Sequence, residues 1–307
     1  MKISAAALCV LLASASAASA ITVTAPGVSP ESITAAPDGV LILGSSSKPA
    51  IYRAAKGEAQ AKPWIDVSAD GMVTILGVLA DAASNTLWAC EVGPRTVPGG
   101  AAFSALLGFD LKTGAPKSHW KLPGDASLCN DIAIGPDHAA YVSDTYNGAV
   151  LRAAPGANSG EVLLKHRALS AVDGLAFVNG VLYVNSVGSY TIWRIPVDAT
   201  GKAGDPVNIW TDAPIKSPDG MRAANGHLFI GENSIGRVSM LTVKDDIAHV
   251  TVLQSGFKTP TAIEPAGDVL WVGDRGAETL TSIPCRADAA QKPNARRDYA
   301  YMISGER

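Results

Sequence analysis

The chain has 307 residues, of which 47% are hydrophobic and 17% charged, and its formal net charge is −3 at pH 7. This slightly acidic balance argues against a nucleic-acid partner, because proteins of that class gather Lys and Arg into basic patches. The length exceeds that of an average domain, but all-β folds of this size are often built as one unit.

The first residues are typical of a secretory signal peptide. Lys2 precedes the apolar run AAALCVLLA, and small residues follow up to Ala18-Ser19-Ala20. We expect cleavage near Ala20, a mature chain that begins at Ile21, and a periplasmic or secreted location. The apolar run is shorter than the roughly 20 residues of a membrane helix and no later stretch reaches that length, so no membrane contact is expected.

Six later segments repeat one pattern: a polar residue, a short apolar strand, a turn of Gly, Asp or Asn, and a second strand with aromatic and β-branched residues. We aligned them on the apolar residue that starts the first strand, and these residues are 42 to 53 positions apart. They are Ile33, Leu79, Ile132, Leu175, Met221 and Ile263. Repeats of that period built from short strands are typical of β-propellers.

Turn residues support a hairpin in each repeat, since pairs such as Asp38-Gly39 and Asn179-Gly180 supply positive φ angles. Two further short strands follow in most repeats, and four strands make one propeller blade. We therefore predict that residues 21–307 form a single all-β domain, a six-bladed propeller with four-stranded antiparallel blades around a central channel. The sequence leaves open whether residues 21–24 or 299–303 supply the outer strand that closes the ring.

The residue two positions before each aligned residue should face the channel, because the first strand of each blade lines the axis. This predicted ring consists of Glu31, Gly77, Asn130, Asp173, Asp219 and Thr261. Three unpaired carboxylates in a partly dry channel carry a large electrostatic penalty unless a cation or protons neutralise them. An oxygen-only set favours a hard ion, Ca²⁺ before Mg²⁺ or Mn²⁺.

Each ring residue taken alone also suits a turn, where Asp and Asn bond to the nearby backbone. Their recurrence at one repeat position favours a metal site. Other charged residues remain open: Asp131, Asp144 and Glu232 lie either beside that site or in solvent, and Arg222 and Arg275 either orient an anionic group or lie in solvent. The His residues lack metal-ligand spacing, so zinc chemistry is not expected.

Cys90 ends the second strand of its repeat, and Cys129 precedes the first strand of the next repeat. Both should lie near the same end of neighbouring blades, and an exported protein can form disulfides. A bond requires Cα atoms within about 7 Å, which spacing in the sequence does not decide. Pairing these two would leave Cys285 as a free thiol.

The segments SPESI, CNDIAIGPD, VDGLAFVNG and SPDGM resemble the metal-binding strands of the senescence-marker-protein, gluconolactonase and luciferin-regenerating-enzyme superfamily, which includes diisopropylfluorophosphatase. The resemblance covers nearly all of the mature chain. It implies a six-bladed propeller, a calcium-type ion, and hydrolysis of lactones or organophosphates. By position, it implies Glu31 and Asn130 as ligands and Asp219 as a ligand that also acts as base or nucleophile.

Three positions depart from the pattern of that superfamily. Asp173 occupies a position that is usually Asn, which should tighten divalent binding. Glu31 is followed by Ser-Ile where sugar lactonases commonly have Gly-Pro, and Leu128 stands where they often carry a substrate-binding Arg. We therefore expect a less polar ester or lactone as substrate rather than a sugar acid.

The sequence thus predicts a monomeric, metal-dependent hydrolase of a lactone or ester-like small molecule, with Asp219 as the catalytic residue. Ca²⁺, or another divalent cation such as Mg²⁺ or Mn²⁺, would be held by Glu31, Asn130, Asp173 and Asp219. One alternative is a non-catalytic secreted propeller that binds a ligand or a protein and contains a structural cation. Another is a propeller with synthase or lyase chemistry, because a fold alone does not decide function.

Overall fold

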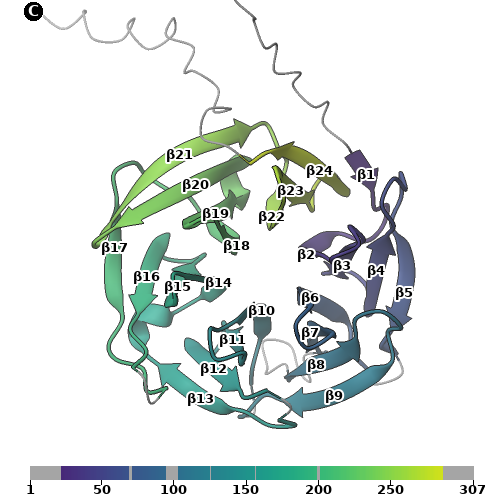
Figure 1. Cartoon of the computed structure of the whole chain (residues 1–307), viewed down its shortest axis with the longest axis horizontal. Coiled ribbons are helices and arrows are strands. Elements are labelled where there is room, and N and C mark those ends of the chain that lie inside the picture. Colours follow the sequence, from purple (N-terminus) through teal and green to yellow (C-terminus); the bar gives the residue numbers. More distant parts are fainter. Residues whose placement is uncertain are drawn as a thin grey trace, which may run out of the picture.

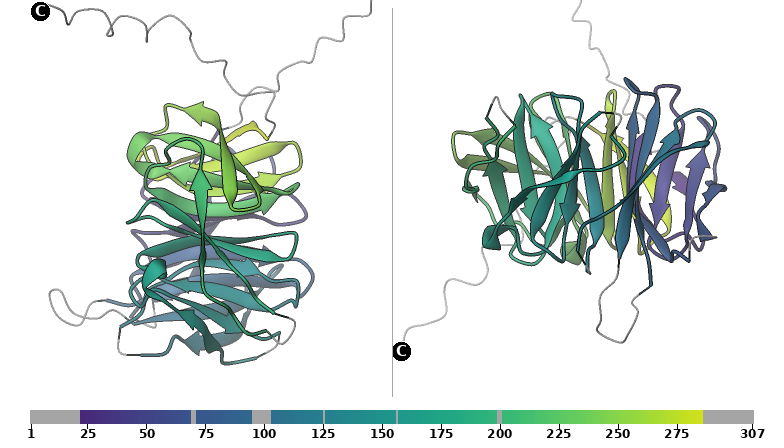
Figure 2. Two further views of the ribbon diagram at one scale, coloured as in Figure 1. Left: turned by 90° about the vertical axis from the view of Figure 1, so that its left-hand side faces the viewer. Right: turned by 90° about the horizontal axis from the view of Figure 1, so that it is seen from below.

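The computed structural model describes residues 22–68, 71–94, 103–124, 126–155, 157–198 and 201–285. These residues form β-strands and short 3₁₀ turns, among them η2 (Arg167–Leu169) and η3 (Asn233–Ile235). Groups of strands surround a central axis (Figure 1), and Figure 2 shows the same strands from the side. Within the described part of the chain, no helix has the length and apolarity needed to cross a membrane. The expected signal peptide and the expected strand at 299–303 lie outside the described residues.

Antiparallel pairing joins the strands in runs of four, from the axis outward. The runs are β2 (Pro30–Ala35), β3 (Leu41–Ser45), β4 (Ala50–Ala54) and β5 (Lys62–Asp66); β6 (Thr74–Asp81), β7 (Thr86–Val92), β8 (Ser104–Asp110) and β9 (Pro116–Lys121); β10 (Cys129–Ile134), β11 (Ala140–Asp144), β12 (Ala149–Ala153) and β13 (Glu161–Lys165); β14 (Val172–Val178), β15 (Val181–Ser186), β16 (Thr191–Ile195) and β17 (Val207–Thr211); β18 (Pro218–Ala224), β19 (His227–Glu232), β20 (Arg237–Lys244) and β21 (Ile247–Ser255); β22 (Pro260–Ala266), β23 (Val269–Asp274), β24 (Thr279–Pro284) and β1 (Thr22–Thr24).

Some neighbouring runs are also joined to each other. Ser45 pairs with Ile75 between β3 and β6, and β17 pairs in parallel with β21, so the sheets that contain these strands have eight strands each. Apolar side chains fill the space between runs. One buried cluster, for example, combines Tyr183 of β15 with Met221 and Leu228 of the next run. The core is therefore distributed between the runs around the axis.

The N-terminal strand completes the last run. β1 pairs antiparallel with β24, with Thr22 opposite Thr281. Val23, the middle residue of β1, is buried and belongs to an apolar cluster that also contains Ile33 and Leu280. Of the two candidate closing strands, the one near the N-terminus therefore occupies this place, and it ties the first described strand of the chain to the last.

The innermost strands are irregular at the positions that the sequence placed around the channel. In β10 the pairing register shifts between Cys129 and Ile132, and in β18 it shifts between Pro218 and Met221. Shifts at the equivalent place occur in β2, β6, β14 and β22. Such bulges change the direction in which side chains point and are common beside active sites. The side chains of the ring residues therefore do not follow the regular alternation between the two faces of a strand.

One position of the predicted ring is wrong by a single residue. The strand pairing places Val78, rather than Leu79, at the aligned position of β6. The ring position is therefore Leu76, and Gly77 lies one residue further along the strand. A Cβ atom at Gly77 would stand 2.4 Å from the carbonyl oxygen of Asn130, so close packing of neighbouring innermost strands requires glycine there.

The disulfide that the sequence left open is present. Cys90 in β7 and Cys129 in β10 are bonded, with their Cα atoms 5.2 Å apart, and both are fully buried. The bond links one run of strands to the next across the cluster that contains Trp88 and Leu106. Cys285 is a free, half-buried thiol.

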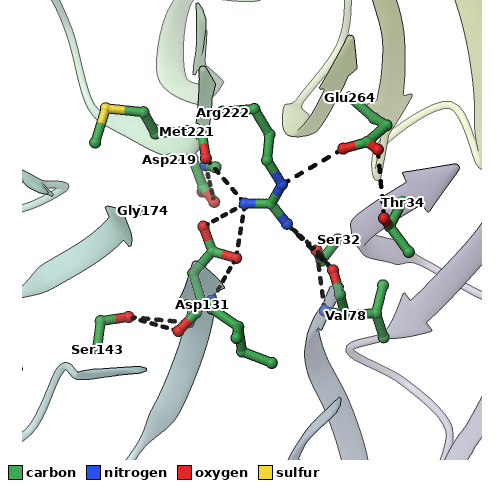
Figure 3. A network of polar contacts seen from close by, with 12 residues as sticks. Ser32, Thr34, Val78, Asp131, Ser143, Gly174, Asp219, Met221, Arg222 and Glu264 are labelled. Atoms are coloured by element: carbon green, nitrogen blue, oxygen red, sulfur yellow. Dashed lines mark hydrogen bonds and ion pairs between the residues drawn. The ribbon is translucent and has the colours of Figure 1, made fainter. Parts of the chain in front are cut away.

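Arg222 of β18 spans the centre of the molecule (Figure 3). Its buried guanidinium donates to both carboxylate oxygens of Asp131 in β10, at 2.9 and 2.8 Å. It also donates to Ser32 Oγ in β2 at 3.3 Å and to the carbonyl oxygen of Val78 in β6 at 3.2 Å. Arg222 Nε lies 3.5 Å from a carboxylate oxygen of Glu264 in β22. One side chain therefore connects the innermost strands of most of the runs.

Glu264 continues this network around the axis. Its Oε1 accepts hydrogen bonds from Ala35 N at 2.9 Å and Thr34 Oγ1 at 3.3 Å. Burial raises the pKa of Glu264 to about 7, against the lowering effect of Arg222. The sequence allowed Asp131 a place beside the metal site or in solvent, and Arg222 a substrate contact or solvent. Both are buried, pair with each other and line the cavity that also contains Asp173 and Asp219.

Removing the disulfide should lower the free energy of unfolding by about 4 kcal/mol, because the bond closes a loop with a sequence separation of 39 residues. Denaturant unfolding of Cys90→Ser/Cys129→Ser measures this effect. Cys285→Ser is the control and should change stability little. Unfolding of the double variant at the same denaturant concentration as the wild type would contradict the prediction.

Arg222→Met should lower the free energy of unfolding by about 3–5 kcal/mol, since it leaves the buried carboxylate of Asp131 without a counter-ion. Urea unfolding measures the loss. Adding Asp131→Asn should restore part of the lost free energy of unfolding, because it removes the buried carboxylate that has no counter-ion in Arg222→Met. A loss below about 1 kcal/mol for Arg222→Met would show that the pair does not hold the runs together.

Candidate metal and catalytic centre

Glu31, Asn130, Asp173 and Asp219 line one small cavity on the axis. They come from the innermost strands of four different runs, β2, β10, β14 and β18. The cavity offers about 10 Å³ to an occupant the size of water, which is space for a single water molecule or ion. Arg222 also lines this cavity, so the network that it forms lies directly beside the four residues.

The carboxyl groups of this cavity are buried and affect one another. Burial raises the pKa of Asp173 well above its usual range, and the charges of Asp219 and Glu31 raise it further. Burial also raises the pKa of Asp219 well above its usual range, again with a contribution from Glu31. The pKa of Glu31 is raised by burial although Arg275 opposes the shift. Each of these groups is therefore stabilised by a proton or by a nearby cation.

Negative groups outnumber positive ones along this part of the axis. Arg222 is engaged by Asp131 and Glu264, and Arg275 is engaged by Glu31. Asp173 and Asp219 have no such partner among the described basic side chains. Protons or a further cation must balance the remaining charge, because uncompensated buried carboxylates cost several kcal/mol each.

Asp219 is held at three atoms. Its Oδ1 accepts from Gly220 N at 3.0 Å, and its Oδ2 accepts from Asn233 Nδ2 at 2.5 Å. Its backbone carbonyl accepts from Asn185 Nδ2 at 2.6 Å. Asn185 is fully buried in β15 and in turn accepts from Gly174 N at 2.8 Å. The segment that carries Asp219 is therefore fixed against the neighbouring run.

Asn130 is oriented by Thr145. The amide nitrogen of Asn130 donates to Thr145 Oγ1 at 3.0 Å, and the Thr145 hydroxyl donates to the carbonyl oxygen of Val172 at 2.7 Å. With the amide nitrogen engaged in this way, the carbonyl oxygen of Asn130 is the atom available to a cation, which requires an oxygen donor.

A second layer of residues, which the repeat alignment did not include, lies at or just after the end of the second strand of each run. The equivalent positions are Ser46, Val92, Thr145, Val187, Asn233 and Arg275. Three of these side chains contact a predicted ligand: Thr145 contacts Asn130, Asn233 contacts Asp219, and Arg275 contacts Glu31. Extending the repeat alignment to the end of the second strand would have revealed them as one set.

The acids that end several second strands hold loops rather than a metal or solvent. Asp144 accepts from Leu128 N at 3.0 Å, and Glu232 accepts from Lys216 N at 2.8 Å. Asp274 binds two N–H groups of the loop between β21 and β22 in the same way. All three acids are buried. The sequence allowed Asp144 and Glu232 a place beside the metal or in solvent, and the structure assigns them this anchoring role instead.

In the described part of the chain, no three His, Cys, Asp or Glu side chains converge in the manner of a ligand set around a metal. The carboxylate of Glu31 is turned to Arg275, and that of Asp219 to Asn233. The lining of the cavity nevertheless has the chemistry that a hard divalent cation prefers, oxygen donors with excess negative charge.

No protein-family model matches this sequence, and no curated protein matches it. Solved structures do match over most of the chain. The gluconolactonase XC5397 from Xanthomonas campestris has a TM-score of 0.66 and 18% identity, with 86% of this chain and 89% of that chain covered. The PQQ-bound aldose sugar dehydrogenase from Streptomyces coelicolor has a TM-score of 0.63 and 18% identity, with 85% and 96% covered.

A virginiamycin B lyase from Staphylococcus aureus also matches, with a TM-score of 0.60 and 13% identity, covering 87% of this chain and 99% of that chain. These proteins are a lactonase, a dehydrogenase and a lyase, so the shared architecture does not select one reaction. At such identities the likeness shows the fold alone. The chain shares the propeller fold of these solved structures.

Proposed function

We propose that the protein is an exported, monomeric, six-bladed propeller that binds one divalent cation, Ca²⁺ in the first instance, and hydrolyses a lactone or ester-like small molecule. Each run of four strands corresponds to one blade in this proposal. The observation that carries it is the single cavity lined by Glu31, Asn130, Asp173 and Asp219, whose negative charge exceeds that of the nearby cations. The buried disulfide supports export, because such bonds persist in oxidising compartments.

The bound ion would polarise the substrate carbonyl as a Lewis acid and stabilise the negative charge that develops on its oxygen. Asp219 accepts the proton of the attacking water. A carboxylate whose pKa is raised is a stronger base than an ordinary aspartate, which suits this role near neutral pH. Gly220 N–H and the Asn233 amide fix the two oxygens of Asp219 and so set the direction from which it receives the proton.

The substrate approaches from the face that carries the second layer, because Arg222 and its partners fill the channel on the other side of the cavity. Thr145, Asn233 and Arg275 are the second-layer side chains that contact the ring from this face. Leu128 precedes the innermost strand of its run and contributes no polar side chain. We therefore include a less polar ester or lactone as the substrate in the proposal. Arg275 is the cationic group near the cavity on this face.

The purified protein should contain about one calcium ion per chain after dialysis against metal-free buffer, measured by elemental analysis. Calcium should raise the melting temperature, since a ligand of the folded state stabilises it by mass action. Its affinity should fall as the pH is lowered, because the raised pKa values of Asp173 and Asp219 allow protons to compete with the ion. Equal metal content in Asp173→Ala/Asp219→Ala and the wild type would contradict the site.

Asp219→Asn should lower the turnover of a good ester or lactone by about 10²–10⁴ at saturating calcium, since the change keeps an oxygen but removes the base. Asp173→Asn is the matched control: it also replaces a ring carboxylate by an amide, and it should retain most of the activity once calcium is saturating.

Recovery of full activity by Asp219→Asn in excess calcium would show that Asp219 is a ligand only. A wild type that hydrolyses no lactone, aryl ester or organophosphate at any calcium concentration would refute the hydrolase and favour the non-catalytic binding protein.

A further inference from the structure

Arg275 already occupies the place of a cation at the acidic ring. It follows β23, and its Nη1 donates to Glu31 Oε2 at 2.8 Å. Glu31 belongs to the innermost strand of the next run, β2, and its side chain is 13% exposed. The Arg275 side chain is 36% exposed, so the guanidinium reaches a buried carboxylate from the open side of the cavity.

Arg275 interacts with the whole acidic ring and not with Glu31 alone. Burial lowers the pKa of Arg275, but the charges of Glu31, Asp219 and Asp173 together raise it above its usual value. These are the same three carboxylates that would hold a divalent ion. The other guanidinium at the cavity, that of Arg222, is committed to Asp131 and Glu264. Arg275 is therefore the one described basic side chain that neutralises the ring.

Hydrogen bonds hold the backbone around Arg275, while its side chain contacts Glu31 through the guanidinium. Arg275 N donates to the carbonyl oxygen of Thr259 at 2.9 Å. The preceding residue, Asp274, accepts from Thr259 N at 2.9 Å and from Ala277 N at 3.1 Å. A change of partner by Glu31 thus needs only a rotation of the long Arg275 side chain, because the loop itself is held.

We propose that Arg275 is an internal counter-ion that competes with the divalent cation for Glu31. In the metal-free protein the guanidinium holds this carboxylate, and binding of the ion displaces it toward solvent. Two cations repel each other strongly at such short range in a partly dry cavity, so the ring cannot hold both in the same arrangement. This inference rests on the proposed metal centre, and it explains why Glu31 is paired with Arg275 in the present structure.

Isothermal titration of the metal-free protein with calcium chloride tests the competition. Arg275→Ala should bind calcium about tenfold more tightly than the wild type or better, because the competing charge is gone. Arg275→Lys should remain near the wild type, since it keeps the charge. Arg194→Ala is the matched control: Arg194 pairs with Asp246 at 2.7 Å, outside the cavity, and removing it takes away one positive charge without altering the ring.

Melting temperature provides a second measurement. Metal-free Arg275→Ala should melt below the wild type, because its ring carboxylates have lost their cation, and calcium should raise its melting temperature by more than it raises that of the wild type. Arg275→Gln, which keeps most of the side-chain volume, serves the same purpose if Arg275→Ala fails to fold.

Unchanged or weaker calcium affinity in Arg275→Ala, beside measurable binding by the wild type, overturns the competition and leaves the metal centre intact. If neither protein binds calcium, magnesium or manganese, the proposed metal centre fails together with this inference. Tighter binding by Arg194→Ala to the same extent would also overturn it, since the effect would then come from net charge alone.

Discussion

The concentration of carboxyl groups on the axis is the constraint on which the rest of the structure depends. Five acidic side chains come together from different innermost strands: Glu31, Asp131, Asp173, Asp219 and Glu264. A protein of marginal stability cannot bury such a set unless nearly every charge finds a partner. The close approach of the innermost strands, seen at Gly77, makes the crowding worse, because it leaves little space for water between the groups.

Two arginines, Arg222 and Arg275, neutralise these carboxyl groups at two levels along the axis. On one level the two terminal nitrogens of Arg222 donate to Asp131, Ser32 and a backbone carbonyl, so these hydrogen bonds link the innermost strands around the axis. On the other level Arg275 makes a single ion pair, and two carboxyl groups keep raised pKa values. Incomplete neutralisation of this kind is typical of functional sites, since a group that is left unsatisfied remains available to a ligand.

The repeat of the sequence was sufficient to predict the all-β propeller, whereas the position of Cys90 and Cys129 in neighbouring repeats made their bond plausible without deciding it. Other features lie beyond a periodic pattern. In β6 two adjacent apolar residues, Val78 and Leu79, both suit the start of the repeat, and alignment on Leu79 rather than Val78 placed Gly77 in the ring. Arg222 reaches partners 91 and 190 positions away in the sequence, and no local signal distinguishes a long side chain that crosses the axis from one in solvent.

We propose that a divalent cation completes the neutralisation of the ring. The most direct measurement is a crystal structure of the protein grown with calcium, with anomalous scattering used to identify the ion. We expect one calcium peak in the axial cavity, bound by oxygen atoms of Glu31, Asn130, Asp173 and Asp219, with Arg275 moved away from Glu31. An intact pair between Arg275 and Glu31, with no calcium peak at millimolar concentration, would contradict it.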